Sequence, residues 1–253
     1  MNTIMRKILV CVPVFVVTGF WLVSTAQAGS FNVVPFEFDP GKTNLVSAQW
    51  ARGVGCPTAA TSFIDDPSTP SDFDPIPTPY TDPACATGDA QDARVEGLLL
   101  VKTGPTPNNA SAVAVLNGVK GTVLTELGYD IRKPAAVPLD DRGSHCGAGA
   151  PRFNVVSEGV LYFIGCNSPA PTTTTVGTGW IRLEWGTGPA TLDAFPAAGG
   201  GPVDITGFVV DSISIVFDEG QDASGGPDQF GAAVLDNINV NGSLVGRGPA
   251  GGK

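Results

Sequence analysis

Histidine is the scarcest reactive residue in this sequence, with His145 the only one among 253 residues. Any Ser–His or Cys–His mechanism would therefore have to use this one side chain. A zinc site is not expected either, because zinc sites combine several Cys and His ligands and the sequence contains no C-x-x-C pair. The sequence gives no basis for predicting a zinc-dependent enzyme.

Lysine and arginine are also few, at 14 against 24 aspartates and glutamates, which gives a net charge of −10. Removing Arg6 and Lys7 with a predicted leader leaves 12 basic against 24 acidic residues, or −12. Nucleic acids and anionic membranes are bound through Lys/Arg-rich surfaces, so neither is an expected partner. The acidic excess favours solubility and cation binding, although a solvated acidic surface by itself accounts for most of it.

Long hydrophobic runs are absent except at the start of the chain. Arg6 and Lys7 precede an apolar stretch over residues 8–23, and Ala26-Gln27-Ala28 follows it. This order predicts a signal peptide over residues 1–28 and a secreted protein, either extracellular or periplasmic. The stretch has sixteen residues, fewer than the roughly 20 that span a bilayer, so no membrane span is expected after cleavage.

The remaining chain is expected to form one domain over residues 29–247, followed by a flexible tail over 248–253. Residues 57–93 are dense in Pro, Asp, Ser and Thr. We expect a long surface loop without regular strands there, because proline lacks the N–H that a sheet requires. Shorter linkers are expected at residues 169–175 and 197–202.

The composition favours an all-β fold, since 33 glycines and 22 prolines separate short runs rich in Val, Ile, Thr and Phe. We expect strands over residues 31–38, 45–52, 95–103, 112–116, 122–131, 152–156, 160–164, 178–185, 205–217 and 230–240. Residues 157–159 should turn a hairpin between two of them. About ten strands in a chain of this length predict an antiparallel β-sandwich.

Four cysteines remain outside the leader: Cys56, Cys85, Cys146 and Cys166. An even number in an oxidising compartment predicts two disulfides, and four cysteines allow three pairings. Proximity in the sequence favours Cys56–Cys85 and Cys146–Cys166.

The last predicted strand carries an acid among apolar residues. Its even-numbered positions from Phe230 to Val240 are apolar apart from Asp236, so strand alternation places this carboxylate on the core face. An isolated buried charge costs many kcal/mol. Asp236 therefore needs hydrogen-bond donors, a cation, or a bulge that turns it outward.

The segment Leu235-Asp-Asn-Ile-Asn-Val240, together with Phe36-Glu37, resembles the closing and first strands of jelly-roll carbohydrate-binding modules and related galactose-binding-like domains. The resemblance implies a jelly-roll sandwich and a structural Ca²⁺ held by Asp236 and Glu37. The alternative is that Asp236 accepts hydrogen bonds from backbone amides.

A second acidic cluster lies in the loop that contains Asp218, Asp222 and Asp228. Oxygen-rich flexible loops suit Ca²⁺, which makes these residues weaker metal candidates. A solvated turn explains the same residues.

The segment Trp180-Ile-Arg-Leu-Glu-Trp185 is the best candidate for a ligand surface. Alternation places Trp180, Arg182 and Glu184 on the face away from the core, where an aromatic ring beside a hydrogen-bonding pair suits a sugar. The same pattern is also ordinary sheet surface. Catalytic carboxylate pairs could be drawn from Glu96, Glu126, Glu158 and Glu184, but their spacing selects no pair.

We therefore expect a secreted, non-catalytic binding module with carbohydrate as the leading ligand and a structural calcium ion. The alternative is a structural or adhesive envelope or extracellular protein that binds a surface protein. A secreted hydrolase comes third. This architecture serves many functions, so the ligand must be argued from the site.

Overall fold

A computed structural model describes residues 30–56, 62–65, 75–78, 88–104, 106, 109–132, 149–176, 180–218 and 231–249. These residues contain strands and no α-helix, so the all-β prediction is confirmed. In this part of the chain, no helix has the length and apolar character needed to cross a bilayer.

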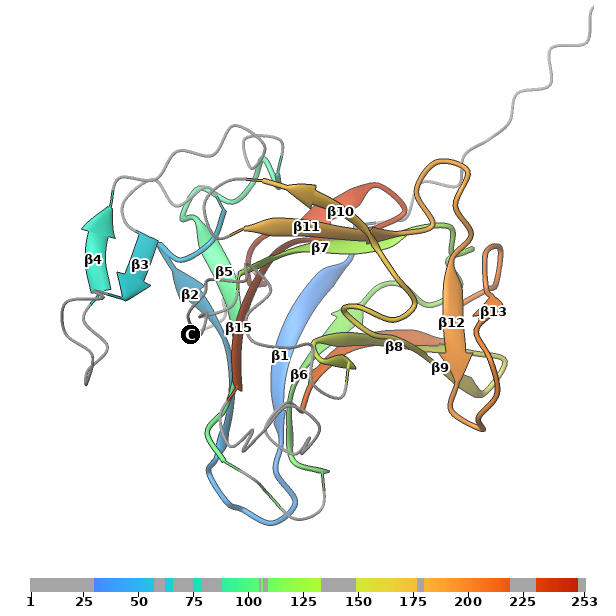
Figure 1. Ribbon diagram of the computed structural model, residues 1–253, viewed down its shortest axis with the longest axis horizontal. Coiled ribbons are helices and arrows are strands. Elements are labelled where there is room, and N and C mark those ends of the chain that lie inside the picture. The colour runs from blue at the N-terminus through green and yellow to red at the C-terminus, as the bar shows by residue number, and fades with distance from the viewer. Residues whose placement is uncertain are drawn as a thin grey trace, which may run out of the picture.

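Fourteen of the sixteen described strands form two seven-stranded antiparallel sheets, which pack face to face (Figure 1). The first sheet has the order β1 (Asn32–Phe38), β6 (Ser111–Asn117), β14 (Ser212–Phe217), β8 (Arg152–Ser157), β9 (Val160–Ile164), β12 (Asp193–Pro196) and β13 (Val203–Asp204). The second has the order β10 (Thr172–Thr175), β11 (Ile181–Trp185), β7 (Leu127–Arg132), β15 (Gly231–Val240), β5 (Glu96–Lys102) and β2 (Val46–Arg52), with β16 (Ser243–Val245) paired to β15.

Consecutive strands repeatedly change sheet, which is the jelly-roll arrangement predicted for this chain. The chain passes from β5 to β6, back to β7, across to β8 and β9, back to β10 and β11, and again to β12, β13 and β14 before it returns to β15. Each crossing lets one strand bury its inner face against the opposite sheet. The resulting core is built from alternate residues of both sheets, with Tyr129, Phe153 and Trp185 in mutual ring contact at its centre.

Two long predicted strands are shorter in the structure. The strand expected over 122–131 begins at Leu127, and the one expected over 205–217 begins at Ser212. The missing halves bridge one another through Val123 and Val209 instead. The reason is a turn at Gly207, whose φ of +85° a regular strand cannot accommodate.

Two segments expected to lack strands contain them. Thr172–Thr175 forms β10 within the expected linker 169–175, because four β-branched residues suit a pleated strand. The Pro-rich loop contains a small antiparallel sheet of β3 (Ser62–Asp65) and β4 (Pro75–Thr78). Pro75 and Pro77 alternate with residues that keep their N–H groups, so one edge of β4 can still pair. The prediction of no strands in this loop is therefore wrong.

The cysteine pairings stay predictions. Cys56 and Cys166 are buried, whereas Cys85 and Cys146 lie outside the described residues. His145 lies outside them too.

The predicted hairpin over residues 157–159 is present between β8 and β9. Ser157 pairs with Val160, so Glu158 and Gly159 form a two-residue loop. Both have positive φ, at 51° and 74°, as the tight turn that matches sheet twist requires.

We expect Gly159→Ala to lower the free energy of unfolding by about 1 kcal/mol, because a Cβ disfavours this left-handed conformation. Gly201→Ala is the matched control, since both sites have open space around a Cβ but only Gly159 has positive φ. Chemical denaturation of both variants measures the difference. Equal stabilities would contradict this explanation of the turn.

Candidate functional site

Of the three residues predicted to bind ligand on and beside β11, Trp180 is placed differently in the structure. Leu183 and Trp185 are buried on the core side, as alternation predicted. Trp180 is also completely buried, in a small cluster that includes Cys56. It precedes β11, so the alternation of the strand does not control where its side chain points. The prediction of an exposed aromatic platform at Trp180 is therefore wrong.

Arg182 and Glu184 lie on the face opposite the core, but Arg182 is engaged within the protein. Its guanidinium donates to both carboxylate oxygens of Asp130, at 2.7 and 3.0 Å, and this hydrogen bonding raises the pKa of Arg182. Burial raises the pKa of Glu184. Asp130 is fully buried and also accepts from the Asn237 amide at 2.8 Å. A ligand role for Arg182 and Glu184 stays a prediction.

Strand β15 changes its inward face in the middle. Leu235 faces the core before an irregularity between Asp236 and Asn239, and Ile238 faces it afterwards. The alternation of even positions therefore holds only for the second half of the strand. Asn237 has a φ of +46°, which accommodates this β-bulge.

Asp236 lies at the bulge and is completely buried. Its carboxylate accepts hydrogen bonds from the backbone N–H groups of Cys56, at 2.5 Å, and Asn237, at 2.6 Å. Burial raises the pKa of Asp236 well above its ordinary value of 3.8. Backbone donors, one of the solutions expected for this acid, are thus present, whereas the bulge moves Asp236 off the core face but leaves it buried.

The structure does not bring together the two carboxylates predicted to share a calcium ion. Glu37 is exposed on β1 and accepts the N–H of Ala48 at 3.3 Å, whereas Asp236 is buried in the other sheet. Within the described ranges, no group of three or more His, Cys, Asp or Glu side chains is arranged to hold a metal. The calcium ion stays a prediction.

A calcium site at the weaker metal candidates also stays a prediction. Asp218 follows β14 and forms a two-point ion pair with Arg152, at 2.7 and 2.8 Å. Asp222 and Asp228 lie outside the described residues.

A cleft of about 890 Å³ lies beside the edge strands β1 and β2. Val34 and Pro35 of β1 line one side, and Trp50 of β2 lines another. The indole N–H of Trp50 donates to the carbonyl of Val33 at 2.9 Å, which ties the two strands together. This bond fixes the half-buried ring as an apolar wall of the cleft.

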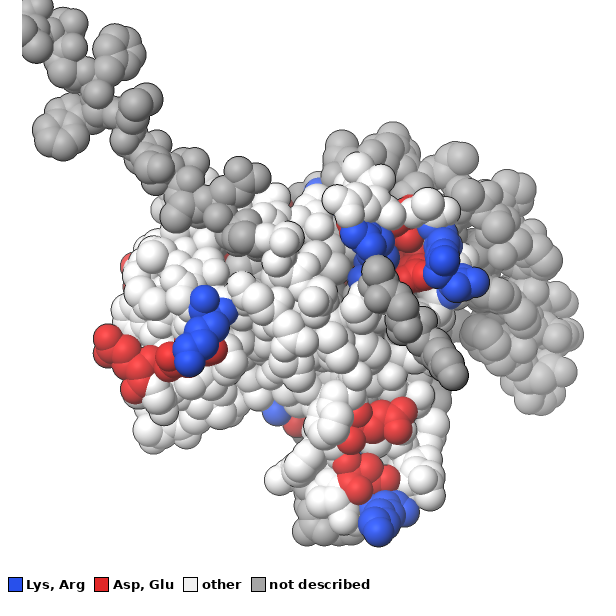
Figure 2. Space-filling model, turned by 180° about the vertical axis from the view of Figure 1, so that it is seen from behind, with Lys and Arg blue, Asp and Glu red and all other residues white. Residues whose placement is uncertain are grey.

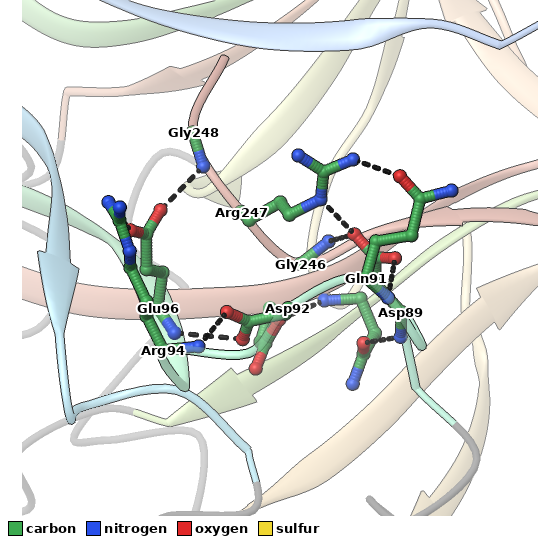
Figure 3. Close-up of polar contacts among 10 residues, drawn as sticks. Asp89, Gln91, Asp92, Arg94, Glu96, Gly246, Arg247 and Gly248 are labelled. Carbon is green, nitrogen blue, oxygen red and sulfur yellow. Dashed lines mark hydrogen bonds and ion pairs between the residues drawn. The ribbon is translucent and has the colours of Figure 1, made fainter. Parts of the chain in front are cut away.

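The loop that leads into β5 forms a second wall, and two aspartates set its conformation. Asp89 accepts the N–H of Gln91 at 2.9 Å, and Asp92 accepts those of Arg94 at 3.1 Å and Glu96 at 2.8 Å (Figure 3). Bonds from a short acid to the backbone two residues on are typical of turns. Burial raises the pKa of Asp92. The loop is therefore held by its own side chains.

The chain after β16 completes the cleft. The Arg247 guanidinium lies 3.4 Å from the Asp89 carboxylate, and the Gly248 N–H donates to Glu96 at 2.9 Å (Figure 3). A Cβ at Gly248 would lie 3.0 Å from Cδ1 of Trp50, so the backbone packs directly on the indole. Gly248, expected to begin a flexible tail, is thus fixed by contacts.

Two exposed arginines stand at the rim. Arg52 Nε and Arg94 Nη1 lie 3.8 and 3.6 Å from the same oxygen of Glu96, and their side chains are 68% and 61% exposed. The pairing of β2 with β5 places Arg52 opposite Glu96. Figure 2 shows that charged side chains on the rear face gather in separate clusters on a largely uncharged surface. Exposed ion pairs of this length are weak, so both guanidiniums stay accessible.

Sequence reasoning missed this cleft. Trp50 and Arg52 come from one strand and Arg94 from a loop, and Arg247 lies more than 150 residues further along. No local motif joins them. The sequence signal that could have pointed to the cleft is the scarcity of basic residues. In so acidic a chain, two arginines on one surface are unusual.

No family model and no curated protein matches this chain. Its structure is similar to a family 11 carbohydrate-binding module from Clostridium thermocellum in complex with a β-1,3-1,4-mixed-linked tetrasaccharide, with a TM-score of 0.37, 13% identity, and coverage of 85% of this chain and 92% of that chain. It is also similar to the family 11 module of the cellulosomal cellulase Lic26A-Cel5E of the same organism, with a TM-score of 0.36, 11% identity, and coverage of 88% and 93%. Both belong to the class that the end motifs resemble.

The buried Asp236 predicts a specific pH dependence. Its carboxyl titrates near 3.8 when unfolded and higher when folded, so the folded protein binds this proton more tightly. Its contribution to stability is therefore present below about pH 3.8 and is lost as the pH rises through the folded pKa. We expect Asp236→Asn to lessen the decline of unfolding free energy above pH 4, measured by denaturation across pH.

Asp204 supplies a control of opposite sign. Hydrogen bonds from Thr206 lower the pKa of Asp204, so its contribution is present above about pH 3.8 and is lost as the pH falls. Asp204→Asn should therefore remove the part of the acid-end fall in stability that Asp204 causes, and it should leave the slope of stability with pH above about pH 4 unchanged. A decline in the Asp236→Asn variant as steep as in the wild type would show that the Asp236 proton is not responsible.

Proposed function

We propose that this chain binds carbohydrate in the cleft beside β1 and β2. The observation that carries the proposal is the combination of a fixed indole wall with exposed guanidinium and amide groups around one cavity. Trp50 supplies the apolar surface, and Gln49, Gln91, Arg52 and Arg94 supply the polar groups. Sugars present apolar C–H faces and hydroxyls together, which this set of groups matches.

The size and rigidity of the cleft support this function. Ligand sites of about 300–1,000 Å³ accommodate small molecules, and about 890 Å³ falls in that range. Its walls are fixed before binding by hydrogen bonds from Trp50 to Val33, from the Glu96 N–H to Asp92, and from Gly248 to Glu96. A preformed site avoids part of the entropy lost on ordering loops around a ligand.

We expect Ala93→Trp to weaken saccharide binding at least tenfold, because Ala93 is exposed and lines the cleft, where an indole would fill the space of the ligand. Ala90→Trp is the matched control: Ala90 is exposed in the same loop but does not line the cleft. A glycan array identifies a binding saccharide, and calorimetry then gives Kd for each variant. An array without saturable binding, or equal loss in both variants, would overturn the proposal.

A specific observation favours a second candidate, a protein-binding role. Phe36 and Phe38 are 53% and 44% exposed on β1, which pairs within the described residues only with β6. Exposed aromatic residues on an edge strand can dock another protein. This role predicts a blank glycan array together with binding to a cell-surface protein. Phe36→Ser and Phe38→Ser should abolish that binding. Binding unaffected by both substitutions would count against it.

From the predicted leader over residues 1–28 we also propose that the protein acts outside the cytoplasm.

A further inference from the structure

Around this cleft both carboxylates and one amide oxygen already have partners. Both oxygens of Asp92 accept backbone N–H groups. One oxygen of Glu96 accepts from Gly248, and the other faces Arg52 and Arg94. The side-chain oxygen of Gln91 accepts from Arg247. These oxygens are therefore poor acceptors for the hydroxyl groups of a ligand.

The donors, by contrast, are accessible. A guanidinium has five N–H donors and no acceptor. The ion pairs of Arg52 and Arg94 with Glu96, at 3.8 and 3.6 Å, are longer than a charge-assisted hydrogen bond of about 2.7–2.9 Å. In the described part of the chain, neither side chain makes a hydrogen bond to another residue. Most of their N–H groups are thus available to a bound molecule.

The charges at this rim are arranged unevenly. Two guanidiniums approach one oxygen of Glu96, and Asp92 supplies a second carboxylate to the cleft, with both of its oxygens bonded to backbone N–H groups. The carboxylate of Glu96 is the inner member of its ion pairs, since its side chain is 11% exposed while the two arginines are 68% and 61% exposed. The side facing a ligand is therefore cationic.

From this donor-rich, cationic rim we propose that the ligand is an acidic saccharide whose uronic acid carboxylate is bound by Arg52 and Arg94. The inference rests on the proposed carbohydrate-binding function and specifies its ligand class. The planar fork of arginine matches a carboxylate with two parallel hydrogen bonds. Both arginines lie within 4 Å of one Glu96 oxygen, close enough together to act on one group.

The rest of the molecule restricts where such a ligand can bind. The chain has a net charge of −10, so the protein as a whole repels an anionic polysaccharide. The rim of the cleft is then the favourable place for a uronate. This contrast favours selective binding over general adhesion to polyanions.

The test uses the full-length protein and calorimetry with two probes of equal length, tetragalacturonate and cellotetraose. We expect tetragalacturonate to bind at least tenfold more tightly, with an affinity that falls as salt is added. Arg52→Gln and Arg94→Gln should each weaken its binding about tenfold, because a charge-assisted hydrogen bond is lost. Both changes should weaken the binding of cellotetraose less than that of tetragalacturonate, because glutamine keeps an N–H donor for a hydroxyl but not the positive charge.

Lys120→Gln is the control, since it removes one exposed positive charge at a site that does not line the cleft. It should leave both affinities unchanged. Arg52→Lys keeps the charge but removes the fork, and it should recover only part of the lost affinity. Thermal unfolding checks that each variant is folded.

The outcomes separate this inference from the function on which it rests. Equal affinity for the two probes, unaffected by Arg52→Gln and Arg94→Gln, overturns the acidic ligand and leaves carbohydrate binding intact. Failure of every saccharide on an array and in calorimetry overturns carbohydrate binding itself. Displacement of tetragalacturonate by an equal charge concentration of poly-glutamate overturns a saccharide-specific site.

Discussion

The buried carboxylate of Asp236 fixes the backbone around which the cleft is built. It accepts the N–H of Cys56, where the chain leaves β2, while the adjacent Asn237 accepts the N–H of Asp89, where the chain approaches β5. Both acceptors are available because the β-bulge turns this part of β15 away from the hydrophobic core. A buried carboxylate without donors would cost many kcal/mol, so these backbone positions are strongly constrained.

The constraint extends from the bulge to the cleft through short contacts. A Cβ on Gly55 or Gly246 would come within 3.0 Å of the Asp236 carboxylate, and one on Gly88 would come within 3.0 Å of the Asn237 amide. Only glycine allows the backbone this close. Because Asp89 then holds the chain around Gly246, the loop before β5 and the segment after β16 meet beside Trp50.

The region around Arg182 and the cleft contain similar residue types but differ in chemical character. Around Arg182 the charges are buried and matched, since Asp130 receives both a guanidinium and the Asn237 amide. At the cleft the acids are turned inward and the arginines outward. The first arrangement stabilises a sheet face, whereas the second leaves donors for a ligand. Identical residue types therefore predict different roles once burial and pairing are known.

The sequence alone determined the fold class, most strands and the hairpin at Gly159, because these depend on local features: β-branched runs, turn residues and period-two alternation. It also identified Asp236 as an acid that needed donors, a cation or a bulge. It could not place Trp180, which lies just outside the regular strand, or locate the bulge that reverses the faces of β15. Only the tertiary structure decided that Arg52, Arg94 and Glu96 share one rim with Gly248, because strand register and long-range chain return bring them together.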